Sequence, residues 1–189
     1  MCIRDRGGQI HLISPLGGDA VQATSLAGGA TKPWWDPSGD YIYSVSDNSI
    51  WRTNVIEGDA QFGQSERITD ATLYPGSAPD ALCVAPNGRW IAFNRKVNRG
   101  DGTTVNQVFV AAAPATEERQ LTFDGDRNHQ LDNNLNWSPD CRWIAYDTRA
   151  FSGGVGNTLT PEKVNIVSQE IVTIYTACLL YTSDAADDR

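Results

Sequence analysis

The sequence lacks several features that would assign it to a familiar class of protein. It contains no apolar run approaching the ~20 residues that a membrane-spanning helix needs. Its 189 residues carry a formal net charge of −8 without a cluster of Lys or Arg, which argues against nucleic acid and anionic membranes as partners. No segment shows a 3.6-residue apolar period over about 11 residues, so little helix is expected.

Cysteine is also scarce. Of the four cysteines, Cys2 and Cys178 lie close to the chain ends, and Cys83 and Cys141 lie near the turns of different repeats. Two isolated thiols in such places make neither a disulfide framework nor a metal cluster. The sequence therefore predicts a fold that is held together by packing.

A repeat occupies most of the chain. The segments "WDPSGDYIYS" (35–44), "VAPNGRWIAFN" (84–94) and "WSPDCRWIAYD" (137–147) align without gaps. The repeated proline recurs after 49 and then 53 residues. This period is close to the ~40–50 residues of a four-stranded propeller blade.

Each copy of the repeat predicts a tight hairpin turn that leads into a strand. Proline presets φ at the first corner, and Gly39 and Gly88 can take positive φ without a steric penalty. Cys141 replaces the glycine in the third copy, so that turn is either strained or of another type. The motif residues are Trp35, Pro37, Gly39 and Tyr41, then Pro86, Gly88 and Trp90, then Trp137, Pro139, Asp140 and Trp143. The four tryptophans among them are expected to fill the gaps between successive blades.

The elements that follow each turn recur in the same order. Third strands are predicted at 49–55, 106–113 and 162–168, and short outer strands at 66–69, 118–122 and 170–175. Residues 9–24 are typical of the last two strands of a preceding blade. The predicted fold is therefore all-β, a partial β-propeller of about three and a half four-stranded antiparallel blades. The predicted blade boundaries are 7–31 for the end of one blade, then 32–70, 80–122 and 128–177 for the other three.

Both chain ends resemble translated sequencing-adapter DNA. "MCIRDR" (1–6) and "CLLYTSDAADDR" (178–189) can be encoded by one DNA element that is read in opposite orientations. We therefore expect residues 7–177 to be an internal piece of a longer, metagenomic bacterial gene.

The third repeat carries a family resemblance. The stretch "RQLTFDGDRNHQLDNNLNWSPDCRWIAYDTR" (119–149) resembles the TolB-like, WD-repeat-like β-propellers, whose blades run from an outer-strand "LT" to "WSPDG" and an aliphatic-aromatic strand. It also looks like an uncharacterised bacterial propeller family that is distantly similar to oligogalacturonide lyases. That likeness would place Asn128, His129 and Gln130 at the entry of an innermost strand. The other two repeats have no equivalent of "NHQ".

The resemblance favours a binding function. We expect a scaffold that binds a protein, peptide or glycan at the channel mouth, through Asn128, His129, Gln130 and Asn134. The connections around 28–31, 75–80 and 124–134 would form one face, because loops on a rigid scaffold usually carry function. The fragment itself is expected to be non-catalytic.

Two enzymatic alternatives remain open. In an oligogalacturonide-lyase-like protein, His129 would be a ligand of a divalent metal in the channel. Alternatively, the piece is the N-terminal propeller of a serine peptidase, with a hydrolase domain further along the gene. TolB-like propellers are often periplasmic, which implies the bacterial periplasm, with the cytoplasm as the alternative.

Overall fold

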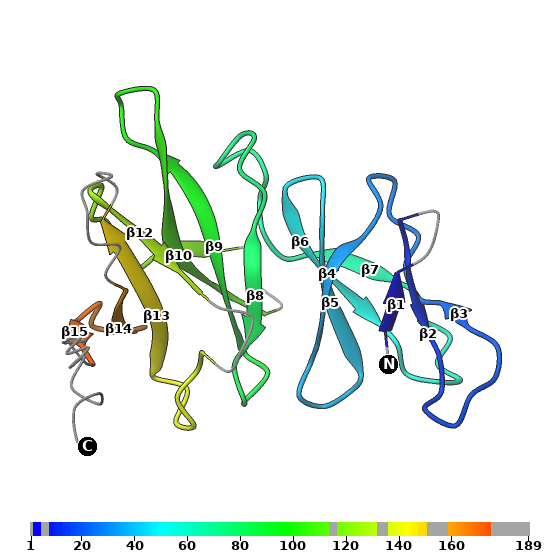
Figure 1. Cartoon of the computed structure of the whole chain (residues 1–189). Coiled ribbons are helices and arrows are strands. Elements are labelled where there is room, and N and C mark those ends of the chain that lie inside the picture. The colour runs from blue at the N-terminus through cyan, green and yellow to red at the C-terminus, as the bar shows by residue number, and fades with distance from the viewer. Residues whose placement is uncertain (1, 5–7, 114–116, 132–135, 151–158, 175–189) are drawn as a thin grey trace, which may run out of the picture.

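A computed structural model of the chain describes residues 2–4, 8–113, 117–131, 136–150 and 159–174. In this part of the chain all regular elements are strands, arranged in four antiparallel sheets. The described residues contain no helix of the length and apolarity that a membrane crossing requires. Figure 1 shows the four sheets side by side in chain order, from blue at one side to orange at the other.

Three of the sheets have four strands whose spatial order follows the chain. The first sheet is formed by β1 (Cys2–Arg4), β2 (Ile10–Leu12) and β3 (Val21–Gln22). The second contains β4 (Thr31–Trp35), β5 (Tyr41–Ser46), β6 (Ser49–Asn54) and β7 (Ser65–Arg67). The third contains β8 (Asp80–Val84), β9 (Trp90–Asn98), β10 (Thr104–Ala112) and β11 (Glu118–Gln120). The fourth contains β12 (Arg127–Gln130), β13 (Trp143–Ala150), β14 (Thr160–Asn165) and β15 (Ile171–Thr173).

The repeated turns have one geometry. In each, the N–H of the fifth motif residue donates to the carbonyl three residues back, with N···O distances of 2.9–3.0 Å: Gly39 to Asp36, Gly88 to Ala85 and Cys141 to Ser138. The φ angles of these donors are 83°, 68° and 57°. Cys141 thus adopts the left-handed conformation that the other two copies assign to glycine, and the third turn is strained by its Cβ.

The threonine that follows each outer strand also has a repeated structural role. The hydroxyl oxygens of Thr24, Thr69 and Thr122 accept hydrogen bonds of 2.8–2.9 Å from the N–H groups of Ile10, Ile50 and Val108. All three threonines are buried. The threonine thus ties the chain beyond each outer strand to the neighbouring strand of the same sheet.

The core lies between the faces of successive sheets. Three apolar clusters fill the first, second and third interfaces; they are centred on Ile10 and Ile42, on Tyr43 and Phe109, and on Val108 and Ile144.

The prediction that all four motif tryptophans are buried between sheets was wrong for Trp35, which is 39% exposed. Neighbouring strand residues point to opposite faces, and it is the adjacent Trp34 that packs against two of the clusters. Trp137 is buried, Trp90 is half-buried against the third cluster, and the Lys163 ammonium lies 4.4 Å from the Trp143 ring centroid.

Candidate functional site at the inner strands

The first strands of the second and third sheets are interrupted at equivalent places. The register shifts between Thr31 and Trp34 in β4, and between Asp80 and Cys83 in β8. At each shift a non-glycine residue has positive φ, 54° at Lys32 and 47° at Ala81. Bulges of this kind redirect side chains and are common next to binding sites.

The bulges bring two opposite charges together. The Lys32 ammonium forms a salt bridge with the Asp80 carboxylate across the two inner strands. Burial by itself raises the pKa of Asp80, but the hydrogen bonds from Lys32 and from the Ala81 N–H outweigh it and hold that pKa below its ordinary value. Both side chains remain exposed, so this pair contributes little stability.

The fourth sheet departs from this pattern. Its inner strand β12 pairs Gln130 with Asp147, and Trp137 pairs with Ile144 through an isolated bridge. Six residues separate Gln130 from Trp137, whereas three separate the equivalent Asp80 from Val84. Trp137 nevertheless pairs with Ile144 as Trp35 pairs with Ile42 and Val84 with Ile91, so the position of this motif residue is kept and only the sequence between the two paired positions is longer.

A small cavity spans the inner strands near the repeated turns. Its volume is about 310 Å³, at the lower end of the range for ligand sites. Residues from all three repeats line it, namely Trp34, Trp35, Pro37, Cys83, Val84, Pro86, Asn136 and Trp137. This space accommodates one or two apolar side chains of a ligand.

Apart from the Cys83 thiol, one non-aromatic polar side chain lines the cavity in the described residues. Asn136 is 7% exposed; its Nδ2 donates to the Ala145 carbonyl (2.9 Å), while its Oδ1 has no partner among the described residues. The indole N–H of Trp137 is already used, because it donates to the Cys83 carbonyl at 3.1 Å. Burial raises the pKa of Cys83 to about 12, so its thiol stays neutral. The site therefore suits an apolar ligand group.

The predicted binding residues lie at the opposite end of the inner strand. The Asn128 side-chain oxygen accepts a 2.9 Å hydrogen bond from the Asn106 N–H of the third sheet. Gln130 is half-buried on β12, and Asn134 lies outside the described residues. These contacts join the third and fourth sheets, and the binding role of the three described residues stays a prediction.

His129 is fully buried at this interface. Its ring centroid lies 5.5 Å from that of Tyr146, and neither ring nitrogen has a hydrogen-bond partner among the described residues. Burial, followed by the nearby Arg127 guanidinium, lowers the pKa of His129, while Asp124 and Glu162 only partly offset these effects. Within the described part of the chain, no three His, Cys, Asp or Glu side chains gather as a metal-binding group.

The Glu162 carboxylate, close to His129, accepts hydrogen bonds from two neighbouring side chains. Glu162 accepts hydrogen bonds from Arg127 Nη1 (2.7 Å) and from the Tyr146 hydroxyl (3.1 Å). Burial, followed by the Glu162 charge, raises the pKa of Tyr146, which therefore stays protonated. In the described residues this arrangement acts as a buried structural network.

Sequence reasoning missed a buried ion pair beneath the connection between β7 and β8. The Arg95 guanidinium lies 2.8 Å from the Glu118 carboxylate, and both side chains are essentially inaccessible. Arg95 also donates to the backbone carbonyls of Ser77 and Asn48. It thereby holds two connections at the same end of the sheets. The sequence feature that could have indicated this pair is an arginine within the strand "WIAFNRKV", which begins with apolar residues.

Comparisons with known proteins identify the architecture. No family model matches the chain. A 59-residue stretch is 42% identical to the uncharacterized protein YidR of Escherichia coli; it covers 31% of this chain and 14% of that protein.

Solved structures match nearly the whole chain. TolB from Acinetobacter baumannii gives a TM-score of 0.57 over 87% of this chain, and a puromycin-hydrolyzing peptidase from Mycobacterium tuberculosis gives 0.63 over 94%, with 15% and 14% sequence identity. The chain spans only 37% and 29% of these proteins. At such identities the likeness shows the fold alone.

The chain has the fold of a partial β-propeller, as the repeat predicts.

Proposed function

We propose that this propeller segment binds a peptide or a peptide segment of a protein partner, at the cavity on the inner strands. The observation that supports this most directly is a cavity wall built of tryptophan, proline and valine, beside which the buried Asn136 Oδ1 has no partner among the described residues. An extended peptide supplies backbone N–H donors together with apolar side chains. Aromatic-lined grooves are typical of surfaces that receive extended, proline-rich segments.

The cavity size and charge agree with a peptide ligand. About 310 Å³ is too small for an oligosaccharide but sufficient for a side chain inserted from an extended chain. The exposed Lys32–Asp80 pair at the neighbouring bulges offers both charges to the rest of the partner. A glycan ligand, by contrast, needs several convergent polar groups, and Asn136 is the one non-aromatic polar side chain, apart from the Cys83 thiol, that lines this cavity in the described residues.

The test is a selection from phage-displayed dodecapeptides on the full chain, followed by calorimetry with the selected peptide. Trp35→Ala removes an exposed wall of the cavity and should weaken binding at least tenfold, which is about 1.4 kcal/mol. Phe123→Ala is the matched control, because Phe123 is 66% exposed on the β11–β12 connection and does not line the cavity. If Phe123→Ala weakened peptide binding more than Trp35→Ala did, the peptide would bind at the connections between strands, which would contradict the proposal.

A serine-peptidase propeller is the second candidate. The similarity to the Mycobacterium tuberculosis peptidase over 94% of this chain favours it at the level of fold. Gene sequence that extends beyond this segment decides the matter, because a G-x-S-x-G strand-to-helix turn would indicate a hydrolase domain. The lyase-like alternative would need further metal ligands around His129, and the metal content of the full-length protein tests it.

A further inference from the structure

A second cavity continues the candidate site along the same two inner strands. Its volume is about 360 Å³, and it is lined by Lys32, Pro33, Trp34, Asp80, Ala81 and Leu82. Trp34 also lines the cavity of about 310 Å³, and along β8 residues 80–82 line one cavity and residues 83–84 the other. Because the two cavities share Trp34 and adjoin along β8, they form one groove, named here the inner groove.

The charge at the Lys32 end of the inner groove is positive. Lys32 and Asp80 neutralise each other in their salt bridge. Lys96 adds a second ammonium group: it lies on β9 two residues beyond Asn94, the cross-strand partner of Asp80, and so is a diagonal neighbour of that carboxylate. Burial by itself raises the pKa of Asp80, and the Lys96 charge is among the influences that lower it. Two ammonium groups against one carboxylate leave a local charge of +1 in a chain whose formal net charge is −8.

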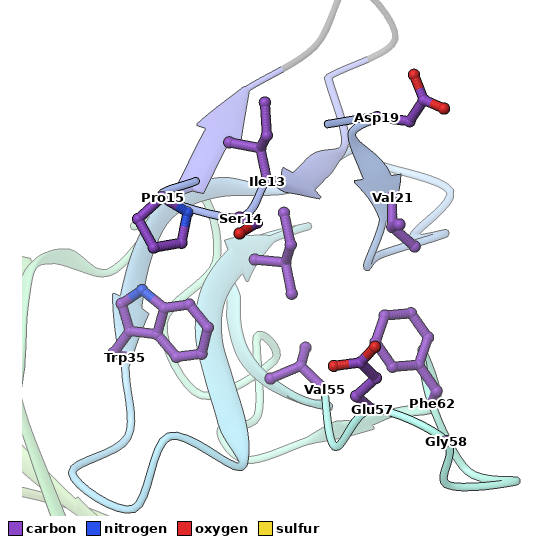
Figure 2. A pocket seen from close by; sticks show the side chains of 11 residues that line it. Ile13, Ser14, Pro15, Asp19, Val21, Trp35, Val55, Glu57, Gly58 and Phe62 are labelled. Atoms are coloured by element: carbon purple, nitrogen blue, oxygen red, sulfur yellow. The ribbon is translucent and has the colours of Figure 1, made fainter. Parts of the chain in front are cut away.

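The larger cavity between the first and second sheets has the opposite charge. Its volume is about 630 Å³, and Figure 2 shows Trp35 on one side of it and Val55, Glu57 and Phe62 below. The charged residues that line it, Asp19 and Glu57, are both acidic. A ligand carboxylate is therefore repelled from this cavity and attracted to the Lys32 end of the inner groove.

The length of the inner groove sets the spacing of the ligand groups. In an extended chain, residues two apart point to the same side and lie about 6–7 Å from each other. Along β8, the step from Ala81 and Leu82 to Cys83 and Val84 is also two residues. A peptide that lies along β8 therefore places one side chain in each cavity when these side chains are two residues apart.

We propose that the inner groove binds an extended peptide in which a glutamate lies two residues from a large apolar residue. The apolar side chain occupies the cavity of about 310 Å³. The glutamate lies in the cavity of about 360 Å³, with its methylene groups against Pro33 and Leu82 and its carboxylate near Lys32 and Lys96. Lys32 can bind it without releasing Asp80, because an ammonium group has three N–H donors. This inference rests on the proposed peptide-binding function and adds an acidic residue to the partner.

The probes are capped hexapeptides that contain Glu-Ala-Leu or Leu-Ala-Glu, and the same peptides with glutamine in place of glutamate. Each is titrated into the full chain and followed by amide and indole NMR shifts. A glutamate peptide should bind about two- to fivefold more tightly than its glutamine counterpart, the effect of one exposed ion pair. Lys32→Met should reduce this preference and leave binding of the glutamine peptide unchanged. Arg67→Met is the matched control, because it removes one positive charge from an exposed position on β7 that does not line the groove, so the preference should remain.

Asp80→Asn separates a binding role of these charges from a structural one. It removes the carboxylate that competes for Lys32, so it should increase the preference for glutamate by about twofold. If the salt bridge served only the fold, Asp80→Asn and Lys32→Met would change binding in the same direction, and the inference would be wrong.

The remaining outcomes distinguish this inference from the proposed function. Equal binding of the glutamate and glutamine peptides, with Trp35→Ala still weakening both, overturns the inference and leaves the proposed function standing. If Trp35→Ala weakens neither peptide, the proposed function fails and the inference fails with it. The absence of binding by all four probes also overturns the inference.

Discussion

Asn94 provides the sharpest test of how the sheets are joined. It lies on β9 and is 3% exposed, and its side chain bonds across to the fourth sheet. Its Nδ2 donates to the His129 carbonyl (2.8 Å) and to the Gln107 carbonyl (3.1 Å), and its Oδ1 accepts from the Leu131 N–H (2.7 Å). One side chain therefore satisfies two buried backbone groups of the inner strand of the next sheet.

Replacing Asn94 by alanine would leave these groups without partners. Each buried, unsatisfied backbone group costs about 1–3 kcal/mol, so leaving the His129 carbonyl and the Leu131 N–H without partners predicts a loss of about 2–6 kcal/mol in the free energy of unfolding. Urea denaturation followed by tryptophan fluorescence measures this difference. Lys96→Ala is the control, because Lys96 is exposed on the same strand and should change stability by less than about 0.5 kcal/mol. A cost below 1 kcal/mol for Asn94→Ala would refute the reasoning.

Three further predictions concern single buried or strained groups. Cys141→Gly should raise the free energy of unfolding by about 1 kcal/mol, because glycine tolerates the positive φ at this turn; no gain in a urea titration would argue against strain there. Arg95→Met should cost about 3–5 kcal/mol by leaving Glu118 buried and unpaired, and adding Glu118→Leu should recover much of that loss in a double-mutant cycle. The neutral His129 ring is favoured in the fold, so its contribution is fully present above the ordinary His pKa of about 6.5 and declines as the pH falls below it. His129→Phe should reduce the loss of stability between about pH 6.5 and pH 5, and an unchanged slope would contradict this.

The repeated turns and most strands could be predicted from the sequence. Proline, glycine and the aromatic strand residues act within a few positions of one another, so "APNGRWIAF" specifies its turn and strand locally. Because the motif acts locally, the sequence left two alternatives for the third turn: a strained turn, or a turn of another type. The φ angle of 57° at Cys141 shows that the turn is strained.

The inner-strand bulges and the buried ion pair could not be predicted from local sequence patterns. A bulge depends on how two strands pair, and the register shift at Lys32 leaves no local pattern in "ATKPWW". Arg95 and Glu118 lie 23 residues apart in the sequence. The free energy needed to bury both charges is offset in part because the guanidinium also donates hydrogen bonds to the Ser77 and Asn48 carbonyls. The candidate cavity likewise depends on three strands that meet only in the folded chain.

We infer that β4, β8 and the segment at Asn136 and Trp137 form one ligand-binding cavity. The most direct test is an NMR titration of the full chain with the selected peptide, observing the indole N–H resonances. We predict shifts for Trp34 and Trp35, which line the cavity, and none for Trp143, which lies outside it. Shifts at Trp143 with Trp34 and Trp35 unchanged would contradict the claim.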